Sequence, residues 1–259
     1  MNIITWNINS VRLRLPLVLA LLAEEQPDVL CLQETKCPDE FFPHEAFADV
    51  GYPHQAVRGQ KSYNGVAIIS KHPLTDIRHL NWAGKEDCRH IAATLEDGSH
   101  IHNFYIPAGG DIADVEANEK FAHKMQFLDE LTTWSKAQTE TSSILVGDLN
   151  IAPREDDVWG HKQLLKVVSH TPMEVDALNG VMAAGNWSDA VRDMIPDGLL
   201  YSWWSYRAKD WDAADKGRRL DHIWVTQPLA DKVVAAKVLR PVRGWEKPSD
   251  HAPVVISLK

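Results

Sequence analysis

The chain has 259 residues, of which 44% are hydrophobic and 24% are charged, and its formal net charge is −9. This composition is typical of a globular protein with a sizeable core. No apolar run approaches the roughly eighteen residues of a membrane-spanning helix, and the N-terminus lacks the features of a secretory signal. Three cysteines without metal-type spacing argue against a disulfide framework and favour the reducing cytoplasm. The acidic balance is unusual for a nucleic-acid-binding protein, but it suits carboxylates gathered around a metal cation.

Short apolar strands alternate with helices along the chain, without a strict strand–helix rhythm. We expect strands at residues 3–6, 29–32, 65–70, 101–106, 143–146, 220–225, 233–239 and 254–258. The 3.6-residue period predicts helices over 15–22 and 121–131, and irregular helices follow the strand at 143–146 until about residue 192. Ten or so strands in this arrangement predict an α/β fold of two packed sheets flanked by helices. Because no repeat or linker divides the sequence, we expect one domain over residues 1–259.

Polar residues follow the first expected strands. Asn7 and Asn9 come directly after the opening strand, where side chains of alternate residues share a face but where asparagine also serves in ordinary turns. Glu34 ends a buried strand, where a carboxylate needs a partner. It is a candidate ligand for a hard cation, or it forms a surface ion pair with Lys36. Tyr105 ends a later strand and is either a hydrogen-bonding group for a phosphate or an ordinary half-buried tyrosine.

The clusters near the later strands are more specific. Asp148 and Asn150 follow Gly147, which permits a close backbone approach. An aspartate there can orient or deprotonate a water, although an Asx turn is the alternative. Asp221 lies within an apolar strand and needs a partner, which is either His251 or Arg219. Near the end of the chain, Asp250 and His251 are held between two prolines that restrict the backbone.

Aromatic and basic residues interleave between residues 202 and 219. Trp203, Trp204, Arg207 and Arg218 belong to this segment. The mixture suits a phosphate backbone with unstacked bases or sugars, and the alternative is a solvated loop over core tryptophans.

Together these clusters resemble the exonuclease III family of abasic-site endonucleases, within the endonuclease/exonuclease/phosphatase superfamily. The matching strings are Trp6-Asn7-Ile8-Asn9-Ser10-Val11-Arg12, Leu32-Gln33-Glu34-Thr35-Lys36, Gly65-Val66-Ala67-Ile68, Gly147-Asp148-Leu149-Asn150-Ile151-Ala152-Pro153, Trp203-Trp204-Ser205-Tyr206-Arg207, Arg219-Leu220-Asp221 and Pro248-Ser249-Asp250-His251-Ala252-Pro253. They span the whole chain.

The resemblance implies a four-layer α/β sandwich of the DNase I type, with two mixed β-sheets flanked by helices. It also implies hydrolysis of phosphodiesters with Mg²⁺, with Mn²⁺ also accepted. Glu34 would be the principal metal ligand, helped by Asn7 and Asp250. The expected metal site as a whole comprises Asn7, Glu34, Asp148, Asn150, Asp250 and His251.

In the catalytic roles that the resemblance implies, Asp148 would position and deprotonate the attacking water, and Asn150 would hold this water or the phosphate. His251, oriented by Asp221, would bind the scissile phosphate, and Tyr105 would act near the phosphate or the leaving group. The residues expected to contact DNA or the abasic sugar are Arg12, Trp203, Trp204, Arg207, Arg218 and Leu220. Two positions depart from the family pattern: Ala108 replaces a phosphate-binding amide, and Arg218 replaces an apolar pocket residue.

The expected activity is hydrolysis of the phosphodiester 5′ to an abasic site in double-stranded DNA, together with 3′→5′ exonuclease and 3′-end-processing activity on recessed or blocked ends. The alternatives are an exonuclease with weak abasic incision, a superfamily phosphatase and a catalytically inactive DNA-binding relative. The last should lack one of the candidate catalytic residues, and none is missing. We expect a monomer in the cytoplasm, associated with the nucleoid during repair and without a membrane partner.

Overall fold

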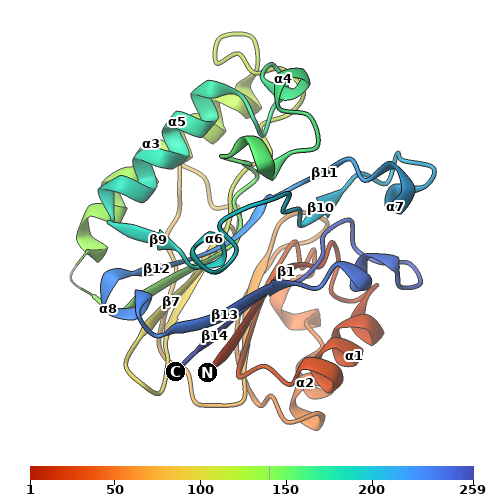
Figure 1. Ribbon diagram of the computed structural model, residues 1–259. Helices are drawn as coiled ribbons and strands as arrows, with labels where there is room; N and C mark the ends of the chain where they lie inside the picture. The colour runs from red at the N-terminus through yellow and green to blue at the C-terminus, as the bar shows by residue number, and fades with distance from the viewer. Residues whose placement is uncertain (140) are drawn as a thin grey trace.

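Two six-stranded β-sheets lie face to face in the computed structural model, which describes residues 1–139 and 141–259 (Figure 1). The first sheet has the order β13 (Val233–Val238), β14 (Val254–Leu258), β1 (Asn2–Asn7), β2 (Val29–Gln33), β4 (Val66–Ser70) and β3 (His54–Arg58). The second has the order β5 (Thr75–Arg78), β6 (His90–Thr94), β7 (His100–Tyr105), β8 (Ser143–Asp148), β12 (Asp221–Thr226) and β9 (Trp187–Asp189). A short separate ribbon pairs β10 (Trp203–Trp204) with β11 (Gly217–Arg218).

Each large sheet is mixed, as predicted. β1 pairs in parallel with β2, and β7 pairs in parallel with β8. The remaining pairs in both sheets are antiparallel. Since parallel neighbours end at the same edge of a sheet, each sheet brings two carboxyl ends of strands to one edge.

Alternation along the strands separates three layers of core. In β1, Ile3 joins the core between the sheets, whereas Ile4 and Trp6 face the helices on the outer side. From the second sheet, residues such as Val146 and Ile223 pack into the same inter-sheet core. The period of two therefore fixes which side chains meet the other sheet and which meet the helices.

Helices cover both outer faces (Figure 1). α1 (Leu15–Glu25) and α2 (His44–Asp49) pack on the first sheet, and α3 (Glu119–Ser135) and α5 (Pro172–Ala184) pack on the second. The short helices are α4 (His161–Leu164), α6 (Ala190–Met194), α7 (Trp211–Ala214) and α8 (Gln227–Ala230). The order helix, sheet, sheet, helix confirms the predicted four-layer sandwich. None of the helices in the described ranges has the length and apolarity needed to cross a membrane.

The expected strands and helices are all present, with ends shifted by a few residues. The described residues form fourteen strands rather than ten or so, because β3, β5, β6, β9, β10 and β11 were not predicted. Most of these are short, or they lie at a sheet edge with much of their surface exposed to water. Such strands need no continuous apolar run, so the hydrophobic pattern does not reveal them.

Candidate active site

The ends of the central strands bring the predicted polar residues together. Tyr105 ends β7 and Asp148 ends β8, and the register places them opposite each other. Asp221 begins the antiparallel strand β12 and lies opposite Asp148 on the other side. Asn7 ends β1 in the facing sheet. Residues far apart in the sequence therefore meet at one end of the sandwich because both sheets present the same edge there.

Gly147 makes the close approach of β7 and β8 feasible. A Cβ atom at this position would lie 1.9 Å from the carbonyl oxygen of Phe104, and the residue has φ of +139°. Any side chain would push the strands apart and move Asp148 away from Tyr105. Asn150 and Glu34 also adopt left-handed backbone conformations, with φ of 54° and 50°. Strained backbone of this kind clusters at functional sites.

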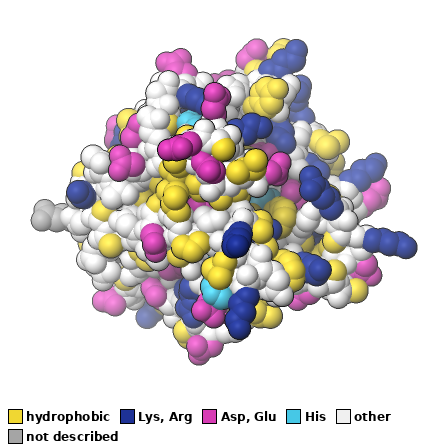
Figure 2. Space-filling view, turned by 90° about the horizontal axis from the view of Figure 1, so that it is seen from above, with side chains coloured by type: hydrophobic (Ala, Val, Ile, Leu, Met, Phe, Trp, Pro, Cys, Tyr) yellow, Lys and Arg dark blue, Asp and Glu magenta, His cyan; other side chains and the backbone are white. Residues whose placement is uncertain are grey.

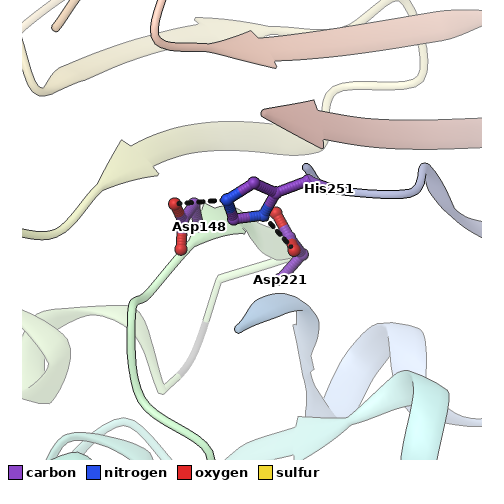
Figure 3. A group of neighbouring side chains, drawn as sticks. All are labelled: Asp148, Asp221 and His251. Carbon is purple, nitrogen blue, oxygen red and sulfur yellow. Dashed lines mark hydrogen bonds and ion pairs between the residues drawn. The ribbon is translucent and has the colours of Figure 1, made fainter. Parts of the chain in front are cut away.

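An aspartate, a histidine and a second aspartate form a chain of interactions, here called the Asp–His–Asp chain. The ring of His251 lies between the carboxylates of Asp148 and Asp221 (Figure 3). His251 Nδ1 and Asp221 Oδ2 are 2.8 Å apart, within hydrogen-bonding distance. His251 Nε2 and Asp148 Oδ2 are 3.7 Å apart, which is too long for a hydrogen bond. The Nε2 proton is therefore held near Asp148 and remains available to another acceptor.

Burial and charge set the protonation of this chain. Burial would lower the pKa of His251, but the carboxylates of Asp221 and Asp148 outweigh it and raise this pKa above its usual range. Burial raises the pKa of Asp148, and the nearby His251 opposes this shift. The imidazole is thus favoured as a cation between two carboxylates. Of the two partners considered for Asp221, the structure selects His251, because Arg219 instead binds Asp157 and Asp189.

Glu34 and Asn7 connect this chain to the facing sheet. Asn7 Nδ2 donates to Glu34 Oε1 at 2.9 Å and to Asp148 Oδ2 at 2.8 Å. Tyr105 Oη also donates to Glu34 Oε1, at 2.9 Å, and Lys36 Nζ lies 2.7 Å from Glu34 Oε2. The ion pair with Lys36 therefore exists alongside the contacts to the site. Burial would raise the pKa of Glu34, but Lys36 and Asn7 hold it below its usual value.

Side-chain donors fix the carboxylate of Asp250, and the backbone of Asn150 fixes that of Asp148. Trp203 Nε1 donates to Asp250 Oδ2 at 2.9 Å, and Asn9 Nδ2 donates to Asp250 Oδ1 at 3.3 Å. The backbone N–H of Asn150 donates to Asp148 Oδ1 at 3.0 Å. The Asx contact considered for the Asp148–Asn150 turn is present, and it fixes the direction of the Asp148 carboxylate.

A cavity of about 270 Å³ opens beside these groups and is called the site cavity. It is lined by Glu34, Tyr105, Ala108, Gly110, Asp148, Asn150, Val168, Ser169, Trp203, Arg218, Leu220, Asp250 and His251. Five predicted residues do not line it. Asn7 and Asp221 contact residues that do, Asp148 and His251. Arg12 is exposed, with its guanidinium 6.0 Å from the ring centre of Phe41, and Trp204 and Arg207 line an adjacent aromatic cavity of about 350 Å³.

Two serines hold the site without having been predicted. Ser202 Oγ donates to Asp221 Oδ2 at 2.6 Å and accepts the backbone N–H of Asp221 at 3.0 Å. Ser249 Oγ donates to the carbonyl of Asn7 at 2.6 Å and accepts the backbone N–H of His251 at 3.2 Å. Ser202 begins the aromatic and basic segment, and Ser249 lies in the string around Asp250 and His251. Hydroxyl contacts between distant segments leave no pattern in the sequence.

A buried ion pair beneath the site was also missed. Lys124 and Glu174 have no exposed side-chain surface, and Lys124 Nζ lies 2.5 Å from Glu174 Oε1. The same ammonium donates to the carbonyl of Asn150 at 2.9 Å, so it joins α3 and α5 to the turn that carries Asn150. A lysine on the apolar face of the helix, three residues after Phe121, is the signal that could have revealed it.

Replacing Lys124 with methionine is expected to lower the free energy of unfolding by about 3–5 kcal/mol, because Glu174 would remain buried without its partner. Urea unfolding measures this change. The control is Lys120→Met on the exposed face of the same helix, for which a change within about 0.5 kcal/mol is expected. Equal changes in the two variants would contradict a structural role for the pair.

Comparison with known proteins agrees with this geometry. The sequence profile of the Endonuclease/Exonuclease/phosphatase family matches residues 4–251. The chain belongs to this family. It is 34% identical to exodeoxyribonuclease III of Haemophilus influenzae, over the full length of both chains. This likeness places it in the exonuclease III branch and confirms the predicted class of hydrolytic nuclease.

Solved structures of this family share the fold closely. An AP endonuclease from Archaeoglobus fulgidus is 33% identical, with a TM-score of 0.94 over 100% of this chain and 99% of that one. The 3′ phosphatase NExo from Neisseria, bound to a product DNA hairpin, is also 33% identical, with a TM-score of 0.93 and the same coverage.

The site fits the divalent metal ion on which the family depends. One ligand atom each from Asp148, Asp221 and His251 lies within 4.8 Å of the others, and His251 and Asp221 already contact each other. Glu34, Asp148 and Asp250 line the site cavity with carboxylate oxygens, which hard divalent cations prefer. Three carboxylates facing one cavity offer oxygen donors, so the donor set suits such an ion.

The face that contains the strand ends carries a basic region despite the acidic net charge. Figure 2 shows Lys and Arg side chains gathered on the side of β10, β11 and α7. Arg207, Lys209 and Lys216 are exposed in this segment. A local positive surface beside the site cavity can attract a polyanion even when the whole protein is acidic.

Proposed function

We propose that this chain is a DNA repair nuclease that hydrolyses the phosphodiester 5′ to an abasic site in double-stranded DNA and processes recessed or blocked 3′ ends. The observation that carries the proposal is the Asp–His–Asp chain, in which Asp148 and His251 line one cavity together with Glu34. In-line hydrolysis needs an activated water and positive groups around the phosphate. The site supplies a carboxylate and a cationic imidazole side by side.

Asp148 is the group that positions the attacking water and accepts its proton. Its carboxylate is fixed by Asn7 and by the backbone of Asn150, and burial raises its pKa towards the range in which a carboxylate acts as a base. The free Nε2–H of His251 donates a hydrogen bond to an oxygen of the scissile phosphate. Asp221 keeps the ring oriented and charged through its contact with Nδ1.

The proposed metal is Mg²⁺, with Mn²⁺ as a substitute, held by Glu34 with Asn7 and Asp250. When bound, it supplies Lewis-acid stabilisation of the charge on the phosphate and the leaving oxygen. Tyr105 donates to Glu34 Oε1 and so orients this carboxylate. Because Trp203 binds the other carboxylate, that of Asp250, the aromatic wall of the cavity and the metal ligands are positioned together.

The abasic sugar is proposed to enter the site cavity against Trp203 and Leu220, which line it. A volume of about 270 Å³ is small for a nucleotide with its base. A sugar without a base also loses no stacking energy when it leaves the helix. The related proteins support both activities, since one is an AP endonuclease and the other a 3′ phosphatase.

We also infer that the enzyme works as a monomer in the cytoplasm, on DNA of the nucleoid. The cysteines Cys31, Cys37 and Cys88 are free thiols, which suits a reducing compartment. Size-exclusion chromatography with light scattering tests the monomer, and cell fractionation tests the location.

A panel of three duplexes tests the proposed activity. One carries a single abasic site, one has a recessed 3′ end, and one is intact with blunt ends. With Mg²⁺, we expect the duplex with the abasic site to be cleaved preferentially at that site, and a chelator should abolish this cleavage. Preferential digestion of the recessed end would instead support the alternative of an exonuclease with weak abasic incision. Failure to cleave any of the three would contradict the proposal.

A further inference from the structure

Arg218 faces the site cavity, whereas its neighbour Arg219 points away from it. Register pairs Arg218 with Trp203 across the β10–β11 ribbon. Alternation turns the next side chain to the other face, where Arg219 lies buried between Asp157 and Asp189. Two adjacent arginines thus have different environments. Arg219 stabilises the fold, and Arg218 borders the site.

The Arg218 guanidinium is held in place, but not all of its N–H donors are paired with described residues. Nη1 donates to the carbonyl of Val168 at 3.1 Å and to Ser169 Oγ at 2.7 Å. Cζ lies 5.3 Å from the ring centre of Trp203. Nη2 makes no hydrogen bond with residues 1–139 or 141–259, and Nε is buried without a partner. The group is therefore fixed by two contacts and a ring while a donor stays free for a ligand.

The charges around the site cavity make this free donor significant. Arg218 is the only Lys or Arg among the described residues that line it, and it faces an excess of carboxylates. His251, the other cationic group there, is committed to Asp221 and to the scissile phosphate. Ala108, in the same wall, has no side-chain donor. Among the described residues that line the cavity, Arg218 is therefore the one Lys or Arg side chain that any additional negative charge beyond the scissile phosphodiester can meet.

We propose that Arg218 is a specificity-determining residue that recognises the terminal phosphate monoester of a blocked 3′ end. This inference rests on the proposed function. In an abasic site, the scissile phosphate continues into a neutral sugar, which Trp203 and Leu220 accommodate. In a 3′-terminal monoester, an ionised oxygen stands where the bond to that sugar would be. A guanidinium next to this position favours the dianion through charge-assisted hydrogen bonds, so it shifts the enzyme towards 3′-phosphate removal.

The test compares Arg218→Leu with wild type on two forms of one DNA hairpin, ending in a 3′-phosphate or a 3′-hydroxyl. Fluorescence anisotropy in EDTA measures binding of both without turnover. Loss of Arg218 is expected to shift the ratio of the two Kd values by at least about tenfold against the 3′-phosphate. In Mg²⁺, kcat/KM for phosphate release should fall by a similar factor, and by more than kcat/KM for incision at an abasic site.

Two control variants distinguish recognition from support of the loop. Lys216→Leu removes an equal charge from the adjacent aromatic cavity, where Lys216 covers the Trp159 ring at 4.6 Å. It should weaken both hairpins equally and leave their ratio unchanged. Ser169→Ala removes one contact that holds the guanidinium but keeps its charge, so the ratio should largely persist.

Two results would contradict recognition of the 3′-phosphate by Arg218. If Arg218→Leu lowers binding of both hairpins to the same extent, or if Ser169→Ala reproduces its effect, Arg218 only supports the loop and the inference is wrong. Absence of DNA cleavage by the wild-type enzyme would contradict the proposed function instead. The binding ratio in EDTA would still decide the role of Arg218, because it does not depend on turnover.

Discussion

Asp148→Asn is expected to lower kcat for abasic-site incision by about 10²- to 10⁴-fold, the range of a lost general base. The amide has nearly the same shape but cannot accept a proton from water. It also has one oxygen for two donors, since Asn7 Nδ2 and the N–H of Asn150 both bind this carboxylate. Single-turnover kinetics with saturating enzyme measures the chemical step separately from DNA binding.

Asp129→Asn is the matched control, because this aspartate is exposed on α3 and changes the charge equally. Its activity should stay within about twofold of wild type. Circular dichroism and urea unfolding should show that Asp148→Asn keeps the fold. An Asp148→Asn variant with near wild-type kcat would remove Asp148 from its assigned role.

His251→Asn is expected to have an effect of similar size, about 10²- to 10⁴-fold in kcat, because it removes the cation and the Nε2 donor directed at the phosphate. Asp221→Asn should lower kcat by a smaller factor, because it leaves the imidazole in place and alters only its charge and orientation. Since Asp221 acts through His251, the double variant should be no slower than His251→Asn alone.

This double-mutant comparison separates two accounts of Asp221. If the losses from His251→Asn and Asp221→Asn multiply, Asp221 contacts the substrate or the metal directly, and the orienting role is wrong. If they do not multiply, the 2.8 Å contact between Nδ1 and Asp221 is the route of its effect. The kcat values of the four enzymes on one abasic duplex are sufficient for the comparison.

The central strands were predictable because both of their faces are buried. β1, β2, β8 and β12 read as apolar runs in the sequence, and every residue of β2, β8 and β12 is buried. The edge strand β5 is largely exposed and contains Asp76 and Arg78, so its pairing with β6 depends on the tertiary fold. The apolar pattern reflects burial, so it does not reveal strands that are largely exposed.

The site was predictable where a polar residue interrupts such a run. Glu34, Asp148 and Asp221 each stand at the end of a buried strand, and the structure brings all three within one site. Alternation places Asn103 of β7 on the same face as Tyr105, but its Nδ2 donates to the carbonyls of Leu32 and Ala67 between the sheets, and the residue does not line the site cavity. Alternation predicts the face of the sheet on which a side chain lies, but it does not predict whether that side chain reaches the site cavity.

Contacts between distant segments could not be predicted from the residue pattern alone. That pattern left both His251 and Arg219 as partners of Asp221, and only the family resemblance implied His251; which of them binds depends on how the two sheets pack. So does the position of Arg218, which the sequence marked as a departure from the family but which only the structure places between Trp203 and Ser169. Its free donor and its isolation among carboxylates follow from the three-dimensional arrangement.

The central claim is that Asp148 and His251 direct water to the phosphodiester 5′ to an abasic site. The most direct measurement is end analysis of a cleaved duplex containing one tetrahydrofuran residue, an abasic analogue that cannot undergo β-elimination. Hydrolysis predicts a single cut on the 5′ side, with a 3′-hydroxyl that a polymerase extends. An uncut tetrahydrofuran duplex, or a cut on the 3′ side of the lesion, would contradict the account.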